Sequence, residues 1–451
     1  MSRCGFHTLD QHKGGLQMKK FVLLSVLLAA ALMLSGCRGG GKTNVEDDTN
    51  QDGKVTISYW NPLTGADGDL MRQLVSDFNK EYEGQIEVAE TYTNELDYYT
   101  NLNLLVPMGR GPEVAIMHSY LVQSYANRNL IMGMDEYIET SEIDINEEDY
   151  IADVFNSLKF NDNLYGIPLD IHVTGIYYNK DLLAKYKLSV PTNRTELIAA
   201  AKKVQAEEKK LGNEVWGLPL STAWPSEWIY TTSLYQNGGL EIDALGAPGY
   251  DTAEGRNALK QVADLIHVEK ISPENLSVDQ DLFYFQTGKA LFHIQGSWML
   301  RDMVKSGVNF GVLPMSNMFG EATDHSEEIA ARSHTFVLPT TTKNVSDEKK
   351  AAIMTFIKYI GDHSYVWATA GQIPASNIAR ATDEYKALEH HAGFGDVDNF
   401  RVSAQSPYLH EAFSPIYSRV TTALLNPDYN SDKLIKDAVS EAKKLIEEAK
   451  N

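Results

Sequence analysis

Cysteine is nearly absent from this sequence. The 451 residues include two, Cys4 and Cys37, and both precede the first regular pattern of strands and helices. The rest of the chain can therefore hold no disulfide framework, no thiolate metal site and no thiol nucleophile. A glycine-rich phosphate loop, H-E-x-x-H and G-x-S-x-G are also missing, and the 12 histidines follow no metal-ligand spacing. We expect no cofactor, no metal site and no enzymatic activity.

Positive charge is scarce as well. The chain has 40 Lys and Arg residues against 61 Asp and Glu residues, for a formal net charge of −21. Because nucleic acids are bound through clustered Lys and Arg, we expect no nucleic-acid partner. A membrane-spanning run is missing too, since the apolar run Phe21–Leu34 is too short to cross a bilayer as a stable helix.

That apolar run has the order of an export signal. Lys19 and Lys20 precede it, and small residues and Cys37 follow it, which predicts a signal peptide over 18–36. Leu34–Cys37 resembles the lipobox of bacterial lipoproteins, in which the cysteine is diacylated, so we expect a palmitate-type anchor at Cys37 on the outer face of the cell membrane. We interpret residues 1–17 as a leader from a mis-assigned start codon, and 37–54 as the lipidated cysteine with a flexible tether.

From residue 55 onward, strand and helix patterns alternate along the chain. Residues 54–62 alternate polar and apolar positions, 69–84 carry an apolar helical face, and 85–92 again have the pattern of a strand. Strand–helix–strand order with short connections predicts a parallel, mixed α/β arrangement. Further amphipathic helices are expected over 347–362 and 431–450.

Several aromatic residues stand beside proline or glycine rather than in a periodic core pattern. An indole or phenol offers a flat apolar face with a polar edge, which suits the C–H face of a sugar ring. Ordinary core packing is the alternative for each of them, and is favoured for Trp216 and Trp367. The residues that show this pattern are Trp60, Trp224, Trp228, Trp298, Tyr408 and Tyr417.

Collinear motifs over about residues 55–450 resemble the bacterial extracellular solute-binding proteins of ABC importers, of the family-1 type that includes maltose-binding protein. One departure is that 193–197 read Asn-Arg-Thr-Glu-Leu where the family has a Trp, which predicts a local packing change. The matching motifs, in chain order, are Gly109–Val114, Gly166–Pro168, Tyr178–Asp181, Pro191-Thr192 with Glu196-Leu197, Ala290–Trp298, and Trp367 through Pro374.

The resemblance implies a two-lobe periplasmic-binding-protein type II fold, each lobe a mixed, mostly parallel sheet flanked by helices, with a hinged ligand cleft between them. Lobe 1 would comprise 55–169 with about 335–372, and lobe 2 about 172–334 with 377–451. The chain would be a monomeric receptor that closes on a carbohydrate, in particular an oligosaccharide, and delivers it to a membrane permease. The ligand-binding residues mapped by motif are Trp60, Asn61, His118, Ser119, Tyr120, Asp170, His172, Trp224, Trp228, Gln295, Trp298 and Tyr417, with Asp67 and Arg332 as neighbours. A structural role is the alternative for His172 and His334.

Two alternatives stay open at this stage. An exported glycan hydrolase would also use aromatic sugar contacts, and paired carboxylates cannot be excluded in so acidic a chain. A binding protein for another cargo, such as a polyamine, a peptide or iron, would keep the same fold. The iron alternative depends on Tyr177 and Tyr178, adjacent tyrosines of the kind that hold ferric ions.

Overall fold

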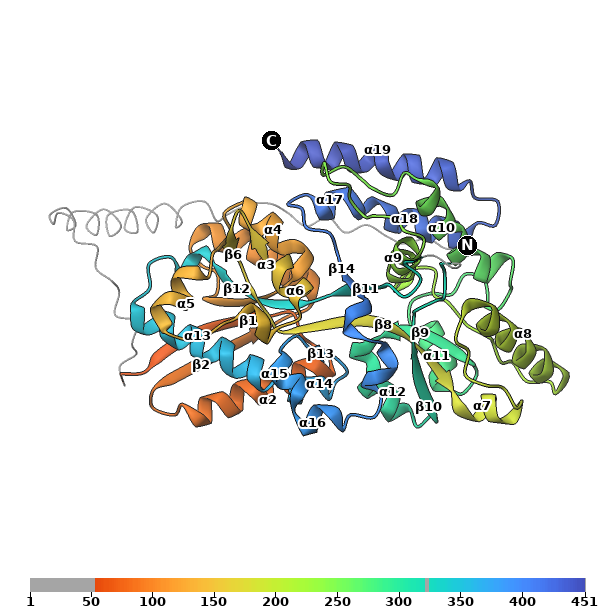
Figure 1. The fold of residues 1–451 in the computed structure, drawn as a ribbon, viewed down its shortest axis with the longest axis horizontal. Coiled ribbons are helices and arrows are strands. Elements are labelled where there is room, and N and C mark those ends of the chain that lie inside the picture. Colours follow the sequence, from red (N-terminus) through yellow and green to blue (C-terminus); the bar gives the residue numbers. More distant parts are fainter. Residues whose placement is uncertain (1–52, 321–323, 451) are drawn as a thin grey trace, which may run out of the picture. The chain divides into compact units, whose positions relative to one another are not determined.

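The computed structural model describes residues 53–320 and 324–450 (Figure 1). The predicted leader, signal peptide, lipidated Cys37 and most of the tether therefore lie outside the described residues. None of the helices in the described part of the chain combines the length and apolar composition of a membrane span.

The first sheet is built from six strands. Its order is β2-β1-β3-β12-β4, with β7 also paired to β12. β1 is parallel to β2 and β3, whereas β12 is antiparallel to all of its neighbours. The strands are β1 (Val55–Asn61), β2 (Ile86–Tyr92), β3 (Val114–His118), β4 (Ile131–Met132), β7 (Ile167–Pro168) and β12 (His334–Pro339).

Helices with one apolar face cover this sheet and close the first core. In α2, for example, Leu70, Leu74, Val75 and Phe78 recur at helical spacing, and all four are buried. The helices whose side chains join this core are α2 (Ala66–Glu81), α3 (Glu95–Leu105), α4 (Ser119–Asn127), α5 (Asp135–Ser141), α6 (Ala152–Ser157), α13 (Asp347–Asp362) and α14 (Ser364–Ala368).

The second sheet is organised around one long strand. β8 pairs antiparallel with β9, β10, β11 and β13, and among the described strands of this sheet only β11 and β14 are parallel neighbours. Its strands are β8 (Asp170–Asn179), β9 (Phe292–Gly296), β10 (Phe310–Pro314), β11 (Ile329–Arg332), β13 (Ile373–Pro374) and β14 (Phe400–Val402).

The second core is larger and takes helices from two distant stretches of the chain (yellow-green and blue in Figure 1). The C-terminal helix is the clearest case, because Ile435, Val439 and Ile446 form a buried stripe along a charged helix. The helices around this sheet are α7 (Lys180–Lys185), α8 (Arg194–Lys210), α9 (Ser226–Gln236), α10 (Ala253–His267), α11 (Gln280–Gln286), α12 (Leu300–Ser306), α17 (Leu409–Phe413), α18 (Pro415–Leu425) and α19 (Ser431–Ala449).

The chain passes between the two sheets along segments that lie side by side. β7 continues through Leu169 into β8, and β11 continues through Ser333 into β12, and the two crossings pair antiparallel with each other. The Leu169 amide donates to the His334 carbonyl at 2.9 Å. Gly166 allows this approach, because a Cβ there would lie 2.6 Å from the Thr335 hydroxyl and 3.0 Å from the Phe336 carbonyl oxygen.

The predicted mixed α/β class is confirmed, with one correction to the sheets. Strand–helix alternation predicted mostly parallel neighbours, yet antiparallel pairs predominate around β8 and β12. The reason is that these two strands enter from the crossings and therefore run against the strands that follow helices. Trp60 is the last residue but one of β1, which ends at Asn61 as predicted. Trp228 lies within α9 and is buried, as a core position would be.

Candidate functional site

A buried carboxylate is the centre of a polar cluster at the crossings. Asp170, the first residue of β8, has no exposed surface, and its two oxygens accept four hydrogen bonds. The His334 amide donates to it at 2.8 Å, His334 Nδ1 approaches at 2.8 Å, His172 Nδ1 at 3.2 Å, and the Trp367 indole at 3.0 Å. Four partners satisfy the oxygens of a carboxylate removed from water.

The charges in this cluster follow from those contacts. Burial alone would raise the pKa of Asp170, but the attraction of His334 and His172 holds it well below its ordinary value. Burial opposes protonation of His334, yet the Asp170 carboxylate raises the pKa of that imidazole. Burial, followed by repulsion from His334, lowers the pKa of His172 to about 4. The cluster therefore holds one carboxylate, with His334 as the ring that takes a proton first.

A third histidine faces the other two from the end of β3. The rings of His118 and His334 lie 4.8 Å apart between centroids, and those of His172 and His334 lie 4.5 Å apart. Tyr99, from α3, places its hydroxyl 2.7 Å from His118 Nδ1 and accepts the His118 backbone N–H at 3.0 Å. Burial lowers the pKa of His118 well below its ordinary value, so this ring is neutral.

Three tryptophans gather beside the histidines. Ring centroids of Trp224, Trp228 and Trp298 lie 5.6–6.5 Å from one another, and His172 lies 5.5 Å from Trp298. The Gly-x-Trp pattern has a local cause here, because a Cβ at Gly296 would lie 2.2 Å from the Trp298 ring. Trp228 is 2% exposed, whereas Trp224 and Trp298 are half-buried and offer accessible ring surface.

An arginine connects the tryptophans to a cavity. The Arg332 guanidinium lies 4.4 Å from the Trp228 ring centroid and 4.9 Å from that of Tyr120, so it is held by both rings. It also donates to the Tyr417 hydroxyl at 3.2 Å. One face of Trp228 is therefore covered by Arg332 in this arrangement.

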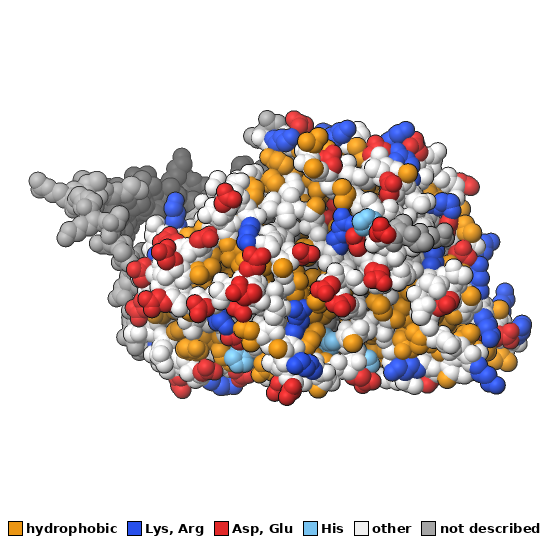
Figure 2. Space-filling view, in the orientation of Figure 1, with side chains coloured by type: hydrophobic (Ala, Val, Ile, Leu, Met, Phe, Trp, Pro, Cys, Tyr) orange, Lys and Arg blue, Asp and Glu red, His pale blue; other side chains and the backbone are white. Residues whose placement is uncertain are grey.

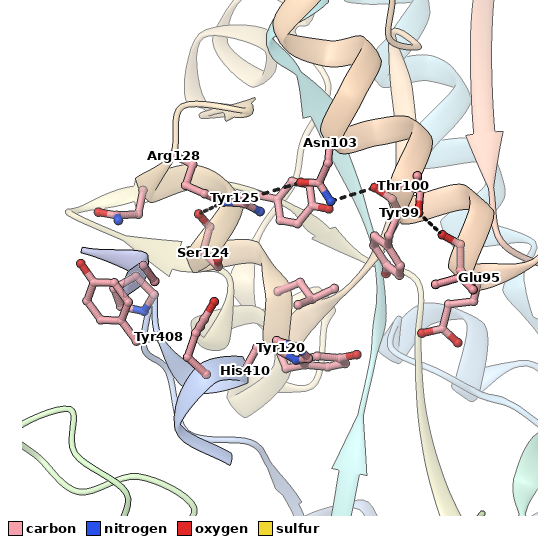
Figure 3. A pocket seen from close by; sticks show the side chains of 16 residues that line it. Glu95, Tyr99, Thr100, Asn103, Tyr120, Ser124, Tyr125, Arg128, Tyr408 and His410 are labelled. Atoms are coloured by element: carbon pink, nitrogen blue, oxygen red, sulfur yellow. Dashed lines mark hydrogen bonds between the residues drawn. The ribbon is translucent and has the colours of Figure 1, made fainter. Parts of the chain in front are cut away.

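The cavity has a volume of about 790 Å³ and is bordered by α3 and α4 on one side and by α17 and the end of α19 on the other (Figure 3). Tyrosine rings and polar groups alternate around it, and Arg128 donates to the Asn103 amide oxygen at 3.1 Å. This volume and this mixture of surfaces are typical of sites for small organic ligands. Its lining includes Glu95, Tyr99, Asn103, Tyr120, Tyr125, Arg128, Tyr408, His410 and Glu411.

Three buried polar groups near these rings have no hydrogen-bond partner among the described residues. They are the Trp228 indole N–H and the hydroxyls of Ser119 and Ser297. Ser119 starts α4 directly after His118, and Ser297 stands next to Trp298. Buried polar groups are normally satisfied, so these three are available to a ligand.

The structure brings most of the predicted binding residues together, but not all into one surface. Asp170, His172, Trp224, Trp228 and Trp298 meet through the contacts above, as do His118, Ser119, Tyr120 and Tyr417. Only Tyr120 of the twelve also lines the cavity.

The remaining predicted residues have their polar groups engaged within the protein. The Asn61 amide donates to Glu90 at 2.7 Å and accepts the Leu63 N–H at 3.1 Å. The Gln295 side chain accepts the Gly296 N–H at 2.9 Å. Trp60 is partly buried against the first core.

Sequence reasoning missed two contributors. Tyr99 has no motif of its own, and it reaches His118 because α3 packs beside β3. Trp367 is fully buried, as a core position would be, yet its indole N–H also holds Asp170. The iron alternative loses support, because Tyr177 is buried and donates its hydroxyl to the Gly296 carbonyl at 2.9 Å.

On the face shown in Figure 2, acidic and basic side chains are interspersed.

Known proteins resemble this chain in sequence and in fold. YcjN, a periplasmic-binding protein of an ABC transporter from Escherichia coli K12, is 26% identical over 302 residues, 64% of this chain and 64% of that protein. The multiple sugar-binding protein of Streptococcus mutans is 23% identical over 366 residues, 76% of this chain and 78% of that protein. The ABC substrate-binding protein Lmo0181 from Listeria monocytogenes, solved with cycloalternan, superposes with a TM-score of 0.72 at 19% identity, covering 87% of this chain and 98% of that one.

The likeness to solved structures shows the fold, which is mixed α/β in two lobes. The family model of the bacterial extracellular solute-binding proteins matches residues 61–366. This range includes the first sheet except for most of β1, and the second sheet except for β13 and β14. With the fold, the crossings and this match in agreement, the chain belongs to the bacterial extracellular solute-binding protein family.

Proposed function

We propose that this protein is the substrate-binding component of an ABC importer and that its ligand is a carbohydrate, an oligosaccharide in particular. The observation that carries the proposal is a continuous series of aromatic contacts. The three tryptophans contact one another, Arg332 lies over both Trp228 and Tyr120, and Tyr120 lines a cavity of about 790 Å³. Flat rings with polar edges bind the faces of sugars, and the neighbouring polar groups bind hydroxyls. The names of the S. mutans and L. monocytogenes relatives, a sugar-binding protein and a cycloalternan complex, support the same ligand class.

The proposed lobes follow the sequence prediction: 55–169 with about 335–372, and about 172–334 with 377–451. The division of the strands between two sheets and of the apolar side chains between two cores supports these boundaries. A ligand that contacts both lobes binds the closed arrangement better and shifts the population toward it. A membrane permease would then receive the closed, loaded receptor, which acts as a monomer and without catalysis.

The binding test uses calorimetry and thermal shift with a panel of mono- and oligosaccharides. At least one oligosaccharide should bind and raise the melting temperature, because a ligand of the folded state stabilises it by mass action. Replacement of Trp224 or Trp298, whose rings have accessible surface, by Ala should then weaken binding by roughly tenfold or more. Trp216→Ala is the matched control, since Trp216 lies at a different surface beside Glu214. A panel without any binder would overturn the carbohydrate proposal.

A glycan hydrolase is the second candidate, because two carboxylates, Glu95 and Glu411, line the same cavity. Glycosidases use such a pair on either side of the scissile bond. Prolonged incubation with the bound oligosaccharide should leave it intact if the protein is a receptor. Product formation that is lost in both Glu95→Gln and Glu411→Gln would establish the hydrolase instead.

A different class of ligand is tested in the same thermal-shift assay. If polyamines, peptides or ferric ion stabilise the protein and sugars do not, the protein is still a binding protein, but its ligand is not a carbohydrate.

We also propose a lipid anchor at Cys37, supported by the lipobox-like order of the sequence. The wild-type protein should fractionate with membranes and carry a diacylated cysteine detectable by mass spectrometry. Cys37→Ser should appear in the soluble fraction. Equal membrane association of both forms would contradict the anchor.

A further inference from the structure

Three histidines from distant parts of the sequence share one point of the fold. His118 ends β3, His172 lies in β8 and His334 begins β12, so the crossings bring together residues more than fifty positions apart. One ring nitrogen of each lies within 4.8 Å of the others. Two of the side chains belong to the first sheet and one to the second.

The hydrogen bonds leave the same nitrogen of each ring for a ligand. The Asp170 carboxylate accepts hydrogen bonds from Nδ1–H of His172, at 3.2 Å, and from Nδ1–H of His334, at 2.8 Å. The Tyr99 hydroxyl oxygen lies 2.7 Å from Nδ1 of His118 and has two acceptor positions, one of which takes the His118 N–H. Within the part of the chain that the structure describes, these hydrogen bonds of the three rings all engage Nδ1, so Nε2 of each ring is left to bind a metal. Metal-binding histidines characteristically direct their other ring nitrogen to a carboxylate or an oxygen acceptor in this way.

We propose that His118, His172 and His334 form a binding site for a divalent transition-metal ion of the zinc type, at the crossing between the two sheets. Three imidazoles without a thiolate suit Zn²⁺, Cu²⁺, Ni²⁺ and Co²⁺ rather than Ca²⁺ or Mg²⁺, which prefer oxygen ligands. A fourth position stays open for water or for an oxygen atom of a ligand, as in other sites with three histidines.

The geometry needs a small adjustment. Zn–N bonds of about 2.0–2.1 Å place tetrahedral ligands about 3.3 Å apart, so ring nitrogens at up to 4.8 Å must move inward by about 1 Å. Rotation of the side chains would supply this movement. The His118 side chain is 13% exposed and that of His334 10%, against 4% for His172, so these two rings have the most room to move.

The surrounding charges favour a cation on balance. Asp170 is a buried carboxylate in direct contact with two of the rings, and Glu95 lies 3.9 Å from His118 Nδ1. Arg332 opposes it, since its guanidinium lies over the Trp228 ring beside His172. The Asp170 carboxylate has the stronger influence on a cation at this site, because it hydrogen-bonds directly to two of the rings, whereas Arg332 contacts the neighbouring Trp228.

The test is metal binding by the chelator-treated protein, with Zn²⁺ alone in calorimetry and Co²⁺ alone in visible absorption. The wild type should bind one equivalent, and Co²⁺ should give the visible bands of a tetrahedral centre. His118→Gln should bind Zn²⁺ at least tenfold more weakly, and Asp170→Asn, which keeps all three rings, about 10–100-fold more weakly. His363→Gln is the matched control, because His363 bonds to the Tyr359 carbonyl outside the cluster.

Each result decides the proposal independently of any sugar. Absence of Zn²⁺ binding by the wild type, or equal affinity of the wild type and His118→Gln, would overturn it. Circular dichroism establishes that the variants are folded. If a variant does not fold, the Co²⁺ spectrum of the wild type decides, and an octahedral spectrum or none would contradict a site of three histidines.

Discussion

Gly371 lies between α14 and β13, where the chain leaves the first core and enters the second sheet, and it shows how closely this segment is packed. Its φ is +122°, and a Cβ there would lie 1.8 Å from the Ser297 carbonyl oxygen, a backbone atom that cannot rotate away. Gly371→Ala should therefore lower the free energy of unfolding by about 2–4 kcal/mol, measured by urea denaturation. Gly361→Ala is the control, because that helical glycine has nothing within 4 Å of an added Cβ and should be neutral or slightly stabilising. Equal effects of the two substitutions would refute this explanation.

Asp281 makes stability depend on pH. Burial raises the pKa of its carboxyl to about 6, while burial lowers the pKa of the neighbouring His293 to about 3 and keeps that ring neutral. The folded state thus holds the Asp281 proton more tightly than the unfolded chain, so this residue costs stability as pH rises from about 4 to 6. The unfolding free energy of Asp281→Asn minus that of the wild type should increase by about 1–3 kcal/mol between pH 4 and pH 7. A difference that stays constant with pH would show that the carboxyl is not shifted.

Single residues of the site were only partly predictable. Asp170 and His172 could be named because they follow a Gly-x-Pro motif, and Trp298 because it follows Gly296. Their partners could not, since the bonds from His334 and Trp367 to Asp170 join positions 164 and 197 residues apart. The sequence likewise predicted no metal site, because three histidines spread over the chain have no common spacing.

The start of α8 accounts for a departure from the family pattern. In the segment 193–197, where the family's Trp is missing, Asn193 is the N-cap residue, and its side chain accepts the Glu196 N–H at 3.0 Å. Glu196 in turn accepts the Thr192 amide at 2.9 Å. Asn193→Ala should cost about 1 kcal/mol of stability in thermal or chemical unfolding. Thr195→Ala is the control, because Thr195 lies two residues further along the helix and is exposed, and it should change stability by less than about 0.5 kcal/mol. A loss as large as that of Asn193→Ala would argue against the cap.

Elements with strong periodicity were predictable, whereas strand direction was not. The apolar stripes of α2 and α19 are visible in sequence because one face of each helix is buried. β8 reads only as an apolar run, and nothing local indicates that four neighbours will run against it. Its direction depends on the crossing at Leu169, which is a tertiary feature.

At the scale of the whole molecule, the receptor should become more compact when it binds its ligand. A ligand held between two lobes favours their closed arrangement, so the radius of gyration from small-angle scattering should fall by a few per cent at saturation. The Trp298→Ala variant, at the same ligand concentration, should show a smaller decrease in proportion to its lost occupancy. An unchanged profile for a saturated wild type would contradict closure.

The crossing segments set what kind of movement is available. The crossings β7–β8 and β11–β12 are hydrogen-bonded side by side, and Gly166 lets them approach closely. They should therefore move together as one two-stranded unit rather than as two independent connections. A pair of hydrogen-bonded strands bends most easily out of its own plane, because bending within the plane would stretch the bonds between the strands. The two halves should consequently close mainly by rotation about one axis that lies across the paired segments.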